Sequence, residues 1–125
     1  MYLYQDLTYK LWGIFFKVYN QLGPGLSEKI YQRAIIQELE TQKISYETEK
    51  VIVIKYKDTK IGRQRLDLII DDKIVIEIKA TDNMHSLFEK QTIAYLKTSN
   101  YKLALLVNFG GDKIIIKRYV HWYHW

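Results

Sequence analysis

The chain has 125 residues and a mass of 15.0 kDa, which fits a single domain over residues 1–125. Hydrophobic residues make up 48% and charged residues 26%, a composition that excludes a disordered chain. Cysteine is absent, which excludes disulfides, thiolate nucleophiles and cysteine-based zinc sites. The net charge of +5 predicts a mild attraction for polyanions and names no partner by itself.

The N-terminal segment does not have the pattern of a signal peptide. Its first twenty residues are interrupted by Gln5, Asp6, Lys10 and Lys17, and they lack a small-residue cleavage site. Apolar runs such as residues 103–107 are far too short to span a bilayer. We therefore expect a cytoplasmic protein with no membrane partner.

Two helices are predicted at the start of the chain, separated by the strong breaker Gly23-Pro24-Gly25. The first is indicated by apolar residues at three- and four-residue spacing, namely Leu7, Leu11, Ile14, Phe15, Val18 and Leu22. The second is expected to begin at an N-cap, Ser27, and to run to about Lys43.

Beyond Ile44 the hydrophobic period changes to that of strands, rich in β-branched residues. Three antiparallel strands are predicted, with turns at Asp58-Thr59-Lys60 and Asp71-Asp72. A third helix and a hairpin around Gly110-Gly111-Asp112 should follow. In chain order, the predicted segments after the second helix cover residues 51–56, 61–70, 73–80, 87–100, 102–109 and 113–120. The predicted order is ααβββαββ.

Three charged residues interrupt strands that are otherwise apolar: Asp67, Glu77 and Lys79. Glu77 and Lys79 share one face of their strand because strand side chains alternate. Asp67 joins them if it lies directly opposite Glu77, which requires a three-residue loop over residues 71–73. A slip of one residue would send Asp67 to the other face, so we predict this register or a bulge of equivalent effect.

Two carboxylates and an ammonium on one sheet surface suggest a metal site. Mg²⁺ prefers oxygen ligands, and Asp67, Glu77 and the carbonyl of Ile78 could supply them. Lys79 could orient or help to deprotonate a water and offset the charge of a phosphate. The alternative is structural: Glu77 and Lys79 would form a solvated outer face, with Asp67 in a turn or a salt bridge.

Further polar residues lie on the predicted helices. Glu28 occupies the first turn of the second helix, where a carboxylate also stabilises the helix dipole. Gln91 and Tyr95 are separated by one helical turn, so they share a face and can reach the same cleft. Each residue alone has an ordinary structural explanation.

Taken in order, these segments resemble the PD-(D/E)XK nuclease superfamily and, within it, the GxxExxY family. The motifs that carry the resemblance lie at Gly25–Tyr31, Arg65–Ile70, Val75–Ala80, Gln91–Leu96 and Leu105–Gly110. The resemblance implies an α/β (α+β) fold with a restriction-endonuclease-like mixed central sheet flanked by helices.

The resemblance also implies roles for the individual residues. Asp67 and Glu77 match the metal ligands and Lys79 the catalytic lysine, while Glu28 matches a helix glutamate that completes the acidic site. Gln91 and Tyr95 match a Q-x-x-x-Y helix motif, in which the glutamine helps to orient the site. Tyr31 is expected to pack its helix on the sheet.

The function expected from these residues is Mg²⁺-dependent hydrolysis of nucleic acid, DNA rather than RNA, with Mn²⁺ able to substitute. The alternative is a module on the same fold that binds nucleic acid or a protein partner with little or no turnover. The aromatic C-terminal segment, residues 119–125, is expected to pack on the domain or on a second subunit, which makes a homodimer a further expectation.

Overall fold

The computed structural model describes residues 3–121, so part of the aromatic C-terminal segment, residues 122–125, lies outside the described residues. The elements are α1 (Gln5–Leu22), α2 (Glu28–Thr41), β1 (Tyr46–Tyr56), β2 (Thr59–Ile70), β3 (Ile74–Lys79), α3 (Ser86–Thr98), β4 (Leu103–Asn108) and β5 (Ile115–Val120). The predicted order ααβββαββ is confirmed. Among residues 3–121, each helix is too short or too polar to span a bilayer.

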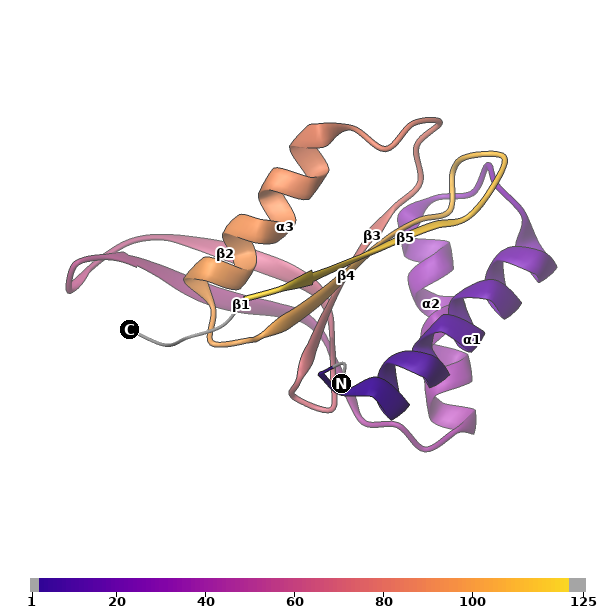
Figure 1. The fold of residues 1–125 in the computed structure, drawn as a ribbon, viewed down its shortest axis with the longest axis horizontal. Coiled ribbons are helices and arrows are strands. Elements are labelled where there is room, and N and C mark those ends of the chain that lie inside the picture. Colours follow the sequence, from indigo (N-terminus) through magenta and orange to yellow (C-terminus); the bar gives the residue numbers. More distant parts are fainter. Residues whose placement is uncertain (1–2, 122–125) are drawn as a thin grey trace.

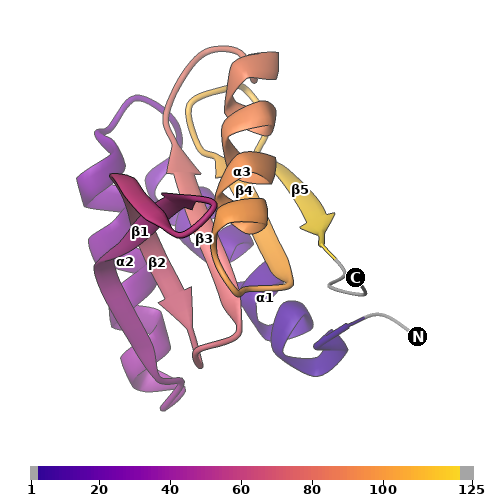
Figure 2. The ribbon, with the colours of Figure 1, turned by 90° about the vertical axis from the view of Figure 1, so that its left-hand side faces the viewer.

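The strands form one mixed sheet in the order β1-β2-β3-β4-β5. β3 and β4 are parallel and the other neighbouring pairs are antiparallel. A parallel pair needs a long crossover, and α3 provides it between β3 and β4. Helices α1 and α2 cover one face of the sheet and α3 covers the other, as Figures 1 and 2 show. This is the restriction-endonuclease-like architecture expected from the resemblance.

The first turn between strands differs from the prediction. Thr59 and Lys60, expected in the turn, open β2 instead, so that the turn consists of Lys57 and Asp58. Lys57 adopts a positive φ of 56°, the conformation that a tight two-residue hairpin turn requires. β2 therefore begins two residues earlier than the turn-forming residues suggested.

Each face of the sheet has its own core. The α1 and α2 side packs Ile74, Ile76 and Ile78 of β3 against the helices. The α3 side packs Val75 with Leu66 and Leu96. The alternation along β3 therefore supplies both cores and leaves Glu77, on the α3 side, as a charged residue among buried neighbours.

Tyr31 fixes the connection between α1 and α2. It is fully buried and stacks on Phe109, with ring centroids 4.5 Å apart and an interplanar angle of 9°. Its hydroxyl donates to the carbonyl of Gly23 at 2.6 Å and accepts from the N–H of Leu26 at 3.2 Å. These contacts place the start of α2, where Glu28 lies, relative to the sheet.

β1 and β2 extend well beyond the rest of the sheet. β2 pairs with β3 only through Leu68, Ile69 and Ile70, whereas it pairs with β1 along nearly its whole length. We call residues 51–65 the arm; Figure 1 shows this hairpin projecting from the body.

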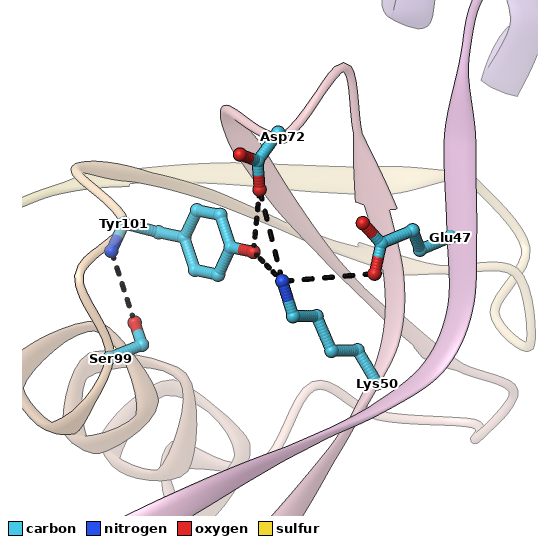
Figure 3. A network of polar contacts seen from close by, with 5 residues as sticks. All are labelled: Glu47, Lys50, Asp72, Ser99 and Tyr101. Carbon is cyan, nitrogen blue, oxygen red and sulfur yellow. Dashed lines mark hydrogen bonds and ion pairs between the residues drawn. The ribbon is translucent and has the colours of Figure 1, made fainter.

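A polar network ties the base of the arm to the body (Figure 3). Lys50, from β1, donates to the hydroxyl of Tyr101 at 2.8 Å, and that hydroxyl donates to Asp72 at 3.0 Å. Asp72 belongs to the β2–β3 turn and Tyr101 to the connection between α3 and β4. The network therefore joins three segments and fixes the direction in which the arm leaves the sheet.

Candidate active site

The register between β2 and β3 is the predicted one. Leu68 pairs with Ile76 and Ile70 with Ile74 around a three-residue turn, residues 71–73. Pairing ends at Leu68 and Ile76, one step before Asp67 and Glu77, and the alternation of faces breaks there, since Leu66 and Leu68 lie in different cores. The predicted turn and register are confirmed up to Leu68. Asp67 and Glu77 do interact through their side chains, but across an irregularity at Asp67 and not as a direct strand pair.

Asp67 marks the point where β2 separates from β3. Its Oδ2 accepts a hydrogen bond from the backbone N–H of Ile78 at 2.8 Å, in place of a carbonyl from the neighbouring strand. Gln32 of α2 donates to the carbonyl of Asp67 at 2.9 Å. The side chain of Asp67 is thus held at the fork between the arm and the central strands.

Glu77 is buried, and its hydrogen-bonding neighbour is the carboxyl group of Asp67. Its relative exposure is 5%, and its Oε1 has no hydrogen-bond partner. Burial, followed by the negative charge of Asp67, raises the pKa of Glu77 to about 9. Without a cation, the carboxyl group is therefore protonated at neutral pH.

Asp67 and Lys79 complete a coupled charge cluster with Glu77. Burial raises the pKa of Asp67, while the N–H of Ile78 and the charge of Lys79 act in the opposite direction. The Nζ of Lys79 lies 4.7 Å from the ring centroid of Phe88, at the start of α3, a cation–π contact. The ring limits the positions that the ammonium can take at the end of β3.

Glu28 stands at the rim of the same site. Burial raises its pKa, the charge of Lys79 lowers it and the charge of Asp67 raises it, so the three groups interact. A cavity of about 220 Å³ lies there, lined by Glu28, Lys29, Gln32, Glu49, Asp67 and Ile78. The structure therefore brings the second-helix glutamate to the acidic pair.

Of the two α3 residues, only Tyr95 shows a coupling to the acidic pair. Its pKa is raised by burial and then by the charges of Glu77 and Asp67. Gln91 lies one turn earlier and is partly buried. In residues 3–121, no hydrogen bond joins Gln91 to the acidic residues, so its orienting role stays a prediction.

Sequence reasoning missed Glu49 and Lys29. Glu49 adopts a positive φ of 53° on β1, where the β1–β2 pairs skip Glu49 and Asp67, and its negative charge raises the pKa of Asp67. Lys29 forms an ion pair with Glu49 at 2.8 Å across the mouth of the cavity. Glu49 could have been found only from the β1–β2 register, which its sequence neighbours do not determine.

A buried amide clamps the loops that follow β3 and β4. Asn108 accepts from the N–H of Thr81 at 3.0 Å and donates to the carbonyl of Thr81 at 2.9 Å. The N–H of Phe109 donates to the carbonyl of Lys79 at 2.9 Å. Gly110 lies so close to this backbone that a Cβ would overlap Ala80 and Thr81. The end of the Lys79 strand is therefore held rigidly.

The carboxylates of Asp67 and Glu77 suit a hard cation, and one buried oxygen atom supports this fit. Glu77 Oε1 is buried and unpartnered beside Asp67, where a divalent cation would satisfy it. In the described range, no group of three or more histidine, aspartate or glutamate side chains is arranged to hold a metal. The fit therefore depends on two carboxylates and a backbone carbonyl.

Comparisons with known proteins identify a family and a similar fold. A family model described as the PD-(D/E)XK nuclease superfamily matches residues 5–119. A solved structure described as the crystal structure of SSO0001 is similar, with a TM-score of 0.58 and 25% sequence identity. The match covers 74% of this chain and 50% of that one, so this chain spans about half its length. No curated protein matches. From the family match over nearly the whole chain, the protein belongs to the PD-(D/E)XK nuclease superfamily.

Proposed function

We propose that this protein is a metal-dependent nuclease that hydrolyses phosphodiester bonds in DNA, with Mg²⁺ as its cofactor and Mn²⁺ able to substitute. The observation that carries the proposal is the buried, unpartnered Oε1 of Glu77 beside Asp67 and within the field of Lys79. Such a group costs stability, and a cation at this position would offset that cost.

Asp67, Glu77 and the carbonyl of Ile78 would hold the metal, and Glu28 would support it from the rim of the cavity. Bound there, Mg²⁺ would act as a Lewis acid toward a phosphate oxygen and lower the pKa of a water. Lys79 is proposed to orient that water and offset charge on the phosphate.

Two residues of α3 complete the proposal. Gln91 is assigned an orienting role toward the acidic cluster. Tyr95, already coupled to Glu77 and Asp67, closes the α3 side of the site. The segment Gly25–Tyr31 supports assignment to the GxxExxY family, because it presents Glu28 to the cavity and anchors its own loop through Tyr31.

The test is cleavage of labelled single-stranded, duplex and branched DNA and RNA in Mg²⁺ or Mn²⁺. Lys79→Ala and Glu77→Ala should each abolish cleavage, and the circular dichroism spectrum of Lys79→Ala should match that of the wild type. Lys10→Ala is the matched control, because Lys10 is exposed on α1. Cleavage that survives Lys79→Ala would refute the assignment.

The alternative function, a binding module with little turnover, is favoured by one observation. The described residues offer no third histidine or carboxylate ligand in a metal-binding arrangement. This alternative predicts nucleic-acid binding that persists in EDTA and in Glu77→Ala, without cleavage by the wild type. Calorimetry with Mn²⁺ on the wild type and Glu77→Ala shows whether the carboxylate pair binds a cation at all.

A further inference from the structure

The positive charge of this protein is concentrated in the arm. Residues 51–65 contain five Lys and Arg against one acidic residue, Asp58, a net charge of +4 out of +5 for the chain. The rest of the chain is thus nearly neutral. Within residues 3–121, no ion pair includes a residue of the arm. The arm therefore presents cations that are not neutralised within the described chain.

The strand register gathers four of these cations on one face. Residues directly opposite each other in an antiparallel pair share a face. The face is formed by the pairs Val51 with Arg65, Val53 with Arg63, and Lys55 with Lys60 beyond the bulge. All six side chains are exposed.

This basic face looks toward the side of the cavity. Ile52 and Leu66 pack on the α3 side of the sheet, so their neighbours Val51 and Arg65 point to the opposite side, where α1 and α2 lie. The cavity with Glu28 and Asp67 is lined by α2 and opens beside the base of the arm. A polyanion bound along this face would therefore extend toward Asp67 and the cavity.

We propose that the basic face of the arm binds the sugar–phosphate backbone of duplex DNA and delivers it to the fork, an inference that rests on the proposed function. From Lys60 to Arg65 the face spans about 17 Å, about half a turn of a duplex. The face carries Val51 and Val53 between its cations and no aromatic ring on which unstacked bases could stack. Backbone contact with a duplex therefore suits it better than single-strand binding.

The test is duplex binding measured by fluorescence anisotropy in EDTA, where no cleavage occurs. The arm variant Lys60→Gln/Arg63→Gln is compared with Lys10→Gln/Lys43→Gln, which removes the same charge at exposed positions outside the arm. Loss of two phosphate contacts lowers the slope of log K against log salt by about 1.8. Raising salt from about 50 to about 200 mM should therefore weaken binding of the arm variant about 12-fold less than binding of the wild type.

The control variant should keep the wild-type slope. Equal slopes for the arm variant and the control would overturn the inference while leaving the proposed nuclease intact. A change in oligomeric state of the arm variant without a change in slope would also overturn it, and would assign the face to a protein contact. Absence of duplex binding by the wild type would also overturn the inference, whereas the proposed function would fail only if none of the nucleic acids were cleaved.

Discussion

Replacing Glu77 by Gln tests whether the acidic site is built around a carboxyl group that is neutral without metal. The amide keeps the size of the side chain and cannot titrate. In the wild type, the pKa of Glu77 is about 9 in the folded protein against an ordinary value of 4.5. The folded state therefore binds more protons than the unfolded state between these two values, and the free energy of unfolding falls as the pH rises.

The size of this effect follows from the linkage relation. The stability that the protonated Glu77 contributes is fully present below pH 4.5 and is lost as the pH rises to about 9. Each pH unit between the two pKa values lowers the free energy of unfolding by about 1.4 kcal/mol. From about pH 5.5 to about pH 8.5 the full effect is about 4 kcal/mol. Because relaxation and water entry around a buried carboxylate weaken its electrostatics, we expect a stability change of about 2–4 kcal/mol.

Urea denaturation in EDTA at several pH values measures the difference between the wild type and Glu77→Gln. Titrating groups away from the site are common to both proteins, so the difference reports on Glu77 together with Asp67, which is coupled to it. From about pH 5.5 to about pH 8.5, the free energy of unfolding of Glu77→Gln should rise by about 2–4 kcal/mol relative to that of the wild type. Mg²⁺ should stabilise the wild type more at the higher pH and leave Glu77→Gln largely unaffected. Parallel pH profiles in EDTA would refute the assignment of a neutral, buried Glu77.

The remaining predictions concern the loops that hold the site. Gly110→Ala should destabilise the protein by about 2 kcal/mol and lower cleavage, because its Cβ overlaps the Thr81 backbone. Gly13→Ala, the control in an exposed helix position, should gain about 0.5 kcal/mol in the same urea measurement. Tyr31→Phe should lose about 1–2 kcal/mol, because its hydrogen bond to Gly23 disappears while the ring stack stays. An unchanged urea midpoint for Tyr31→Phe would show that the loop is held by stacking alone.

Hydrophobic periodicity was enough to predict the architecture. The three- and four-residue spacing around Leu11 and Phe15 predicted α1, and both residues are fully buried. Alternation around Glu77 and the Asp71–Lys73 turn predicted the β2–β3 register as far as Leu68, next to Asp67. These predictions succeeded because a slip of one residue would expose an entire apolar face.

The β1 side of the site could not be predicted in the same way. β1 is half-exposed along its length, so hydrophobic patterning only weakly determines its register. Glu49 reaches Asp67 through a positive φ that no local residue demands, since it is neither glycine nor asparagine. The ion pair between Glu49 and Lys29 likewise depends on how α2 docks on the sheet, a long-range contact that periodicity does not describe.

The early end of the β2–β3 pairing, at Leu68, matters for the chemistry of the site. If β2 continued beside β3 past Leu68, a backbone carbonyl would satisfy the N–H of Ile78 and the Asp67 side chain would have no fixed partner. Because the arm departs there, the carboxylate takes the place of that carbonyl and is held against Glu77. The same departure exposes the basic face of the arm beside the cavity. One break in strand pairing therefore orients the acidic pair and frees the surface that we propose for DNA.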